Sequence, residues 1–209
     1  MPRLLKHALA AFALVVMCAA ADANASTVTI DFDSLAAGTV LTNQFVGLGV
    51  TFSNSAGPLR AQNATPGPPF TAPIAILPDN FSVLGNTNRA NFTVAVNTVS
   101  VTIGDFDADT DVLHLELYDA ANNLLGSDVQ TLPATVNGGL VLSVTVVNPN
   151  VAYALFYGRG VNENSSYFDN FIFGQQGTSN VPEPTTMLLL GTGLAGVGGA
   201  IRRRRKAQL

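Results

Sequence analysis

The sequence predicts an all-β fold, an antiparallel β-sandwich of the jelly-roll type, over residues 26–173 of the 209-residue chain. Short runs rich in Val, Ile, Thr and Phe recur along this stretch, and each is bounded by Gly, Asn, Asp or Pro. No run has the length or the period of an amphipathic helix, and short strands separated by turn residues are typical of packed antiparallel sheets. The expected strands are residues 28–32, 49–53, 74–77, 91–96, 99–103, 113–118, 124–132, 140–147, 151–157 and 167–173.

The first 25 residues have the order of a secretory signal peptide. Arg3 and Lys6 form a basic region, residues 8–20 are apolar, and an Ala-x-Ala sequence predicts cleavage by signal peptidase between Ala25 and Ser26. The single cysteine of the chain lies within this leader. We therefore expect an exported mature chain without a disulfide.

Residues 181–206 have the order of a short motif, a membrane span and a cytoplasmic stop. Pro182, Glu183 and Pro184 cannot be helical, because each proline fixes its own φ and disfavours helical geometry in the preceding residue. Residues 185–201 are an apolar stretch at the short limit for one transmembrane helix, and residues 202–206 are five consecutive cations that stay in the cytoplasm. We expect residues 174–180 to be a polar linker.

This combination of motif, glycine-rich span and basic cluster resembles the PEP-CTERM sorting signal of Gram-negative bacteria. The resemblance implies that an exosortase, a membrane cysteine transpeptidase, reads the motif at residues 182–184 and removes the span and the basic tail. It also implies a precursor anchored in the inner membrane, followed by delivery to the cell surface or the extracellular space. A simple single-pass anchor behind a proline-rich stalk is the alternative.

Strand alternation is clearest at residues 113–118, where leucines alternate with polar side chains, as in a strand with one buried face. Residues 119–123 then form a hairpin turn. Residues 55–73 contain five prolines, which cannot donate hydrogen bonds within a central strand, so we expect a long surface loop there. This loop is a candidate binding segment, and a solvated loop without a task is the alternative.

The exported part of the chain is strongly acidic. Residues 26–180 contain ten Asp and two Glu against three Arg, which gives a net charge of −9. Such a surface disfavours nucleic acid and anionic lipid as partners. Metal cations and neutral, hydroxyl-rich ligands remain compatible with it.

The densest acidic cluster is an alternating series of four aspartates. They repel one another unless they are splayed into water or neutralised by a cation, and calcium takes six to eight oxygen ligands from flexible loops. The spacing imitates an EF-hand loop, but Thr110 stands where that loop needs glycine. A calcium loop between strands and a solvated acidic turn both remain open. The four residues are Asp105, Asp107, Asp109 and Asp111.

A second acidic set comes from the two ends of the domain. Asp31 lies in the first expected strand and Asp33 directly follows it, while Asp169 lies in the last, and the first and last strands of a sandwich commonly lie side by side. The surrounding motifs, Asp-Phe-Asp and Phe-Asp-Asn-Phe, resemble jelly-roll domains of PEP-CTERM proteins and, more distantly, carbohydrate-binding modules of galactose-binding-like fold. This resemblance implies a structural calcium at the terminal strands, and we favour this set for any structural ion. The alternative is that Asp169 and Asn170 only satisfy backbone groups.

Catalysis is not expected. Once the leader is removed, His114 is the only histidine and no cysteine remains, so a Cys-His pair is excluded. Sugar binding has more support, because four tyrosines offer rings for stacking, although the chain has no tryptophan and aromatic residues in strands are more often core. The four are Tyr118, Tyr153, Tyr157 and Tyr167.

The sequence therefore predicts an exported, non-catalytic protein of the cell surface or extracellular matrix, associated with exopolysaccharide or biofilm. The expected partners are signal peptidase, an exosortase-type transpeptidase, exopolysaccharide and, before processing, the membrane through the C-terminal span; nucleic acid is not expected. Calcium is the expected cofactor. The first alternative is a carbohydrate-binding module with a glycan site near residues 55–73, and the second is a cryptic hydrolase.

Overall fold

The computed structural model describes residues 25–64, 67–79, 85–105, 109–160, 166–176 and 191–192. The chain divides into two compact units, one formed by Ala25–Gly177 and the other by Met1–Asn24 with Thr178–Leu209. The expected signal peptide up to residue 24, the motif at residues 182–184, the basic stop and nearly all of the expected span lie outside the described residues. No helix in the described parts of the chain combines the length and the apolar character needed to cross a bilayer.

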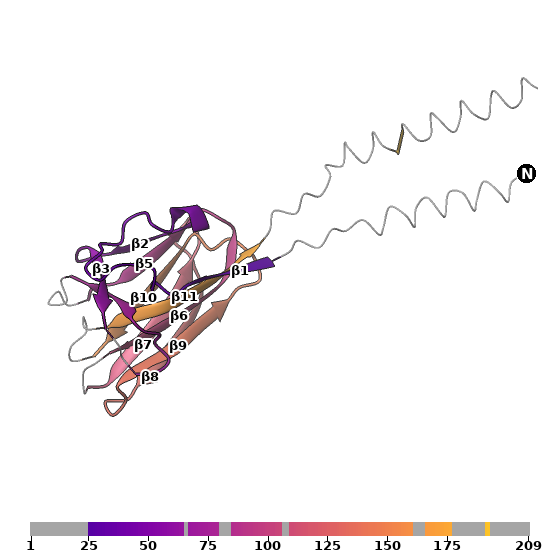
Figure 1. The fold of residues 1–209 in the computed structure, drawn as a ribbon. Coiled ribbons are helices and arrows are strands. Elements are labelled where there is room, and N and C mark those ends of the chain that lie inside the picture. The colour runs from indigo at the N-terminus through magenta and orange to yellow at the C-terminus, as the bar shows by residue number, and fades with distance from the viewer. Residues whose placement is uncertain are drawn as a thin grey trace, which may run out of the picture. The chain divides into compact units, whose positions relative to one another are not determined.

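The unit Ala25–Gly177 is a sandwich of two antiparallel sheets, as the sequence predicts (Figure 1). Sheet A consists of β1 (Ala25–Ile30), β3 (Leu59–Asn63), β4 (Ile74–Pro78), β6 (Val96–Asp105), β9 (Gly138–Thr145) and β11 (Tyr167–Gln176). Sheet B consists of β2 (Val50–Asn54), β5 (Asn88–Phe92), β7 (Asp111–Tyr118), β8 (Leu124–Leu132) and β10 (Tyr153–Arg159), and the 3-10 helix η1 (Val46–Leu48) precedes β2.

The order of the strands places β11 and β10 inside their sheets. Sheet A runs β3-β4-β11-β6-β9, with β1 paired to β11 beside this path, and sheet B runs β2-β5-β10-β7-β8. Neighbours in space are often distant in sequence, so most of the pairing is long-range. β7 and β10 lie next to each other in sheet B and pair antiparallel.

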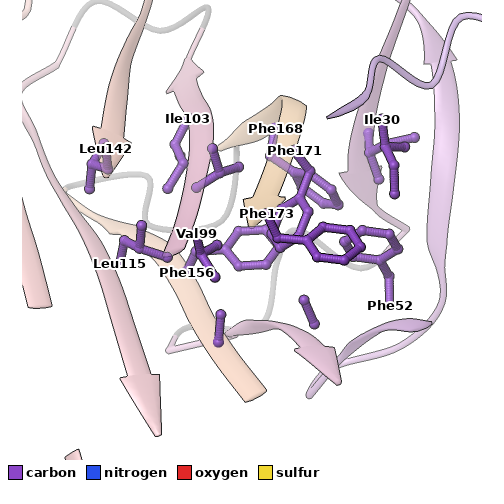
Figure 2. Packing of buried hydrophobic residues seen from close by; sticks show 14 of the residues in the cluster. Ile30, Phe52, Val99, Ile103, Leu115, Leu142, Phe156, Phe168, Phe171 and Phe173 are labelled. Carbon is purple, nitrogen blue, oxygen red and sulfur yellow. The ribbon is translucent and has the colours of Figure 1, made fainter. Parts of the chain in front are cut away.

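The core lies between the sheets and is rich in phenylalanine. The three leucines of β7 at residues 113, 115 and 117 are fully buried, as their alternation predicts. Figure 2 shows phenylalanines of β11 meeting Phe52 and Phe156 of sheet B in one cluster. The rings of Phe52 and Phe171 meet edge to face with centroids 5.0 Å apart, and such pairs contribute roughly 0.5–1.5 kcal/mol beyond their burial. This packing fixes sheet B against sheet A.

The two ends of the sandwich unit lie side by side, because β1 pairs antiparallel with β11 from Ala25 opposite Gln176 onward. β11 therefore continues past the expected domain boundary, and residues 174–176 belong to a strand rather than to the linker. Their composition is polar, but β1 and β6 supply the backbone hydrogen-bond partners that a linker would lack. The predicted cleavage point before Ser26 lies at the beginning of β1.

The expectation of an unbroken loop over residues 55–73 is wrong in its middle, where β3 forms. β3 pairs antiparallel with β4 along its whole length, and its alternate residues Leu59 and Ala61 are buried. The prolines of this segment flank the strand instead of interrupting it. On its other side β3 contacts residues 38–41, and the backbone N–H of Ala61 donates to the carbonyl oxygen of Thr39 at 2.9 Å.

β5 lies earlier in the chain than expected, at Asn88–Phe92 rather than at residues 91–96. Thr93 donates its backbone N–H to the carbonyl oxygen of Gly49 at 2.9 Å, and Val96 already begins β6 in the other sheet. The apolar run at residues 91–96 therefore spans a crossover between the sheets. Hydrophobicity alone does not mark where such a run turns.

Candidate functional site

The outer face of sheet B gathers aromatic and charged side chains from three neighbouring strands. Alternation turns every second residue of β5, β10 and β7 away from the core, and these outward positions carry rings, guanidinium groups and one carboxylate. We call this surface the aromatic face. Its members are Arg89, His114, Glu116, Tyr118, Tyr153, Tyr157 and Arg159.

Cross-strand pairs on the aromatic face stack their rings. Tyr153 lies directly opposite Tyr118, and Tyr157 directly opposite His114. The two tyrosine rings of the first pair have centroids 5.0 Å apart and planes at 10°, and the values for the second pair are 4.7 Å and 16°. Opposite residues of an antiparallel pair stand only about 4.5–5.5 Å apart, so the strand register itself builds both stacks.

An arginine lies over one tyrosine of each stack. The guanidinium carbon of Arg89 is 3.5 Å from the ring centroid of Tyr153, and that of Arg159 is 4.0 Å from the ring centroid of Tyr157. One face of each tyrosine already lies against its ring partner, so each arginine covers the other face. A guanidinium in this position gains both stacking and cation–π attraction.

The two arginines differ in how many of their nitrogens are occupied. Arg159 donates from Nη1 to the carbonyl oxygen of Asn86 at 3.0 Å and from Nη2 to the hydroxyl of Thr87 at 3.3 Å, so it fastens β10 to the turn before β5. Arg89 donates from Nε to the side-chain oxygen of Asn91 at 2.7 Å. Within the described residues, that is its one hydrogen bond, and both Nη atoms remain available.

Glu116 lies between two tyrosine hydroxyls. Tyr118 donates to its Oε2 atom at 2.6 Å and Tyr157 donates to its Oε1 atom at 2.9 Å. The hydrogen bond to Glu116 raises the pKa of Tyr118 to about 12, and burial, followed by the hydrogen bond to Glu116, raises the pKa of Tyr157 to about 12. Both phenols therefore keep their protons at neutral pH and donate them to the carboxylate.

His114 belongs to the aromatic face rather than to a catalytic pair. Burial lowers its pKa, an effect that Glu116 opposes and Arg159 reinforces, so the imidazole is neutral at physiological pH. Its ring lies against Tyr157, and no hydrogen bond joins it to a serine or carboxylate in the part of the chain that the structure describes. A nucleophile with a hydrogen-bonded base is what acyl transfer requires.

The stacking decides what this face offers a ligand. Tyr118, Tyr153 and Tyr157 are three of the four tyrosines expected to bind sugars, and the fold brings them together, whereas Tyr167 lies apart in β11 of sheet A. Tyr153 is only 7% exposed, because it lies between a ring and a guanidinium group. A ligand therefore meets ring edges, hydroxyls and guanidinium groups, and its recognition depends on hydrogen bonds and charge.

Asp169 lies in a bulge of β11 and is fully buried. Its carboxylate accepts hydrogen bonds from the backbone N–H and the hydroxyl of Thr71, at 2.8 and 2.9 Å, and from the backbone N–H of Asn170 at 2.7 Å. Burial raises the pKa of this carboxyl group. Phe168 and Phe171 both face the core although they are three positions apart, so an extra residue is inserted between them.

The other two members of the terminal acidic set lie just beyond β1, which ends at Ile30. Asp33 accepts a hydrogen bond from the backbone of Ile74 at 3.1 Å, and Asp31 accepts one from the backbone of Asp33 at 3.2 Å. Asp33 lies close enough to Asp169 to repel its charge. Among the described residues no group of three or more His, Cys, Asp or Glu side chains is placed to hold a metal ion, and calcium binding stays a prediction.

The alternating series of four aspartates at residues 105–111 is only partly described. Asp107 and the side chain of Asp105 lie outside the described residues. Asp111 is buried as the first residue of β7, so it does not belong to a fully solvated turn. A side chain at Gly160 would collide with the Asp111 carboxylate and approach that of Asp109, which places both near the end of β10. Calcium binding by this set also stays a prediction.

Comparison with protein families resolves the C-terminal segment, because residues 180–205 match the PEP-CTERM protein-sorting motif. The chain carries a PEP-CTERM sorting signal. The match covers nearly the same residues as the expected segment at 181–206 and includes Pro182, Glu183 and Pro184. A PEP-CTERM signal marks an exported protein and implies an exosortase as its processing partner.

Comparison with whole proteins adds fold-level similarity to the PEP-CTERM match. The search of curated proteins finds no match. Among solved structures, a DUF4465 family protein from Bacteroides caccae is similar at 11% identity and a TM-score of 0.47, covering 72% of this chain and 100% of its own. The CBM22-1 xylan-binding domain of Paenibacillus barcinonensis Xyn10C is similar at 13% identity and 0.46, covering 76% and 100%.

A third similar structure is the C-terminal family 22 carbohydrate-binding module of Clostridium thermocellum Xyn10B, at 12% identity and a TM-score of 0.41, with 71% of this chain and 99% of that chain covered. At identities this low the likeness concerns the sandwich architecture alone. The functional argument for this chain therefore rests on its PEP-CTERM signal and on its own surface.

Proposed function

We propose that this chain is an exported, non-catalytic protein of the bacterial surface or matrix that binds polysaccharide through the aromatic face and is associated with exopolysaccharide or biofilm. The observation that carries the proposal is the combination of a sorting motif at residues 180–205 with a domain whose outer sheet face presents tyrosine hydroxyls and guanidinium groups. Sorting delivers the domain outside the cell, and the aromatic face binds the hydroxyl-rich chains found there. The proposed glycan site is thus the aromatic face and not the neighbourhood of residues 55–73.

Polysaccharide fits the aromatic face better than other macromolecules. Protein interfaces also favour tyrosine and arginine, but their fully buried centre is mostly apolar, whereas the tyrosine stacks present their polar edges. Nucleic acid needs several Lys or Arg side chains to neutralise its phosphates, and residues 26–180 contain three arginines and no lysine. A sugar chain exchanges its bound water for hydrogen bonds to hydroxyl and guanidinium groups fixed in place by the sheet.

The titratable groups of the aromatic face support the non-catalytic part of the proposal. Glu116 is held by two phenols, and neutral His114 is stacked on a ring. A glycosidase needs two carboxyl groups on either side of the bond that it breaks. Glu116 is the one carboxylate among the members of the aromatic face.

Binding to the aromatic face is tested by electrophoresis of the purified full chain in native gels that contain polysaccharide from the producing strain. Retardation of the wild type should weaken by about tenfold or more in Tyr118→Ala, because the variant loses a ring stack and a hydrogen bond to Glu116. The matched control is Thr145→Ala on the outer face of sheet A, which should migrate like the wild type. Equal retardation of all three proteins would contradict the proposal.

Sorting is tested by the C-terminal mass and the fractionation of the protein in its host. We expect Glu183→Ala to remain in the inner membrane with its C-terminus uncut, because an exosortase reads the motif that contains Glu183. Ser179→Ala, just outside the matched residues, is the control and should be processed normally. If Glu183→Ala shows the wild-type mass and location, the segment is a simple anchor.

Deletion of residues 202–206 tests the stop. Each of these cations costs roughly 2.5–3.5 kcal/mol at the middle of a membrane helix, so their removal should misplace the motif relative to the exosortase and slow processing. A tail-less protein that is processed at the normal rate would show that the cluster has no such role.

Calcium remains the proposed cofactor, with the terminal acidic set as the favoured site. Asp33 and Asp169 repel each other when both are charged, and a bound cation would relieve that repulsion. Their hydrogen bonds to Ile74 and Thr71 compete with this role. Melting curves measured with calcium and with a chelator show whether calcium binding or these hydrogen bonds prevail.

A further inference from the structure

We propose that the aromatic face recognises an acidic polysaccharide, with the guanidinium group of Arg89 binding the carboxylate of a uronate-type sugar unit. This inference rests on the proposed function and names the ligand class of the same surface. It follows from where the few cations of the domain lie and from which of them already have partners.

Cations are rare in the exported domain. Residues 26–180 contain three arginines and no lysine against twelve acidic residues. Arg60 in β3 is paired with Asp79, whose two carboxylate oxygens each accept a hydrogen bond at 2.6 Å. Arg89 and Arg159 both lie on the aromatic face, and in the described part of the chain neither of them forms an ion pair. The carboxylate of the aromatic face, Glu116, accepts hydrogen bonds from tyrosine hydroxyls instead.

Arg89 is held in position by contacts that leave its terminal nitrogens available. The Tyr153 ring lies 3.5 Å from its guanidinium carbon, and Asn91 accepts a hydrogen bond from its Nε atom. These two contacts fix the plane of the guanidinium group, so less conformational entropy is lost when it binds a ligand. The paired N–H groups of a guanidinium match the two oxygens of a carboxylate. Both Nη atoms of Arg159, in contrast, already donate hydrogen bonds to the turn before β5.

The immediate surroundings of Arg89 favour an anionic group, although residues 26–180 as a whole carry a net charge of −9. Physiological salt screens exposed charges beyond about 8 Å, so the residues beside Arg89 decide whether one ligand carboxylate binds there. Ser53 lies directly opposite it on β2, and Leu155 lies opposite it on β10, so neither neighbouring strand places a charge beside it. Glu116 lies one strand further, on β7, and each of its oxygens accepts a hydrogen bond from a tyrosine hydroxyl. Both oxygens of the carboxylate of the aromatic face thus accept hydrogen bonds from tyrosines. The Nη atoms of Arg89 can therefore donate to a carboxylate of the ligand.

The experiment compares polygalacturonate with the same polymer after chemical reduction of its carboxyl groups. Calorimetric titration of the purified full chain at neutral pH and physiological salt should show the acidic polymer binding about tenfold tighter or more, as expected for a charge-assisted bidentate contact. Arg89→Gln should lose this preference. Arg60→Gln makes the same change in charge on sheet A and should keep the preference. Arg89→Lys keeps the charge without the planar fork and should keep a weaker preference.

Each outcome decides between the two levels of the argument. Equal affinity of the wild type for both polymers, or equal losses in Arg89→Gln and Arg60→Gln, overturns the acidic-ligand inference and leaves polysaccharide binding intact. Failure to bind polygalacturonate overturns the inference, and failure to bind the polysaccharide of the producing strain as well overturns the proposed function. Thermal unfolding of each variant checks that it is folded. If Arg89→Gln does not fold, Arg89→Lys still tests the inference, because its preference for the acidic polymer should be weaker than that of the wild type.

Discussion

Asp169 in β11 and Glu116 in β7 are two carboxylates with satisfied oxygens that are held in different ways. Asp169 is fully buried, and its donors are two backbone N–H groups, the hydroxyl of Thr71 and, at 3.3 Å, the side-chain amide of Asn170. Glu116 is partly exposed, and its donors are the hydroxyls of Tyr118 and Tyr157. Backbone donors at Asp169 cannot turn away from their positions, whereas tyrosine hydroxyls can rotate toward water.

From this contrast we expect Asp169 to contribute more to stability and, under the proposed function, the aromatic face to contribute more to binding. The carboxylate of Asp169 joins the bulge of β11 to Thr71, so its loss disconnects two segments that are distant in sequence. Glu116 organises side chains that already stand on one rigid sheet. We therefore expect substitutions in the terminal acidic set to change the free energy of unfolding, and substitutions in the aromatic face to change ligand affinity.

The largest expected effect is that of Asp169→Ala on the free energy of unfolding. Removing this acceptor leaves buried or half-buried donors without partners, which costs roughly 2–4 kcal/mol. Glu116→Ala should cost less than about 1 kcal/mol, because the two hydroxyls find water. Denaturant unfolding of the purified full chain measures both. Equal losses would remove the distinction between the two regions.

Calcium binding at the terminal acidic set would increase the difference in stability contribution between that set and the aromatic face. An ion bound only by the folded state stabilises it by about 2.7 kcal/mol at a concentration one hundred times its Kd, so the melting temperature of the full chain should rise. Asp31→Asn combined with Asp33→Asn should abolish that rise, and Asp105→Asn combined with Asp107→Asn should preserve most of it. Scanning calorimetry with calcium and with a chelator is the measurement. Identical wild-type melting curves in both conditions would show that neither acidic set binds calcium.

The pH dependence of stability is the next expected effect. Burial raises the pKa of Asp169 above the ordinary value of 3.8, so its contribution to stability is present below that value and is lost as the pH rises through the raised pKa. The free energy of unfolding of the wild type relative to Asp169→Asn should therefore fall with rising pH over that window. Asp119→Asn serves as a control of opposite sign, because hydrogen bonds from Asn123 lower the pKa of Asp119. A difference that is flat with pH would exclude the titration of Asp169.

The smallest expected effect is on the tyrosines of the aromatic face. Glu116→Gln should lower the pKa of Tyr118 from about 12 toward its ordinary value of 10.0, because the hydrogen bond to Glu116 is the main cause of its shift. Tyr157 should respond less, because burial is the main cause there. Alkaline titration followed by ultraviolet absorbance measures both, and Asp128→Asn in β8 should leave both unchanged. A larger response of Tyr157 than of Tyr118 would reverse the assignment of causes.

Local patterns predict a good part of this fold. The alternation in β7 and the turn after it are confirmed, because a period of two within one strand needs no knowledge of its neighbours. The pairing of the first and last strands is also confirmed. The bounds of β3 and β5 were missed, because proline content and hydrophobicity do not say where a neighbouring strand supplies partners.

The candidate site is less predictable, because it depends on strand register. His114 and Tyr118 are four residues apart in β7, and so are Tyr153 and Tyr157 in β10. Antiparallel pairing of two strands with equal spacing brings both pairs opposite each other at once, so this spacing is the pattern that predicts the stacks. The position of Arg89 over Tyr153 has no counterpart in the local sequence, since it depends on the pairing of β5 with β10.

The position of Gln176 at the end of β11, opposite Ala25, has a mechanical consequence. A domain attached through the residues that follow Gln176 receives any drag from the surrounding fluid at the end of this strand. β11 pairs with β1 and β6 on its two sides, and antiparallel ladder bonds lie perpendicular to the strand. A pull along β11 would therefore load these bonds together in shear instead of opening them one after another, which favours a domain that stays folded under tension.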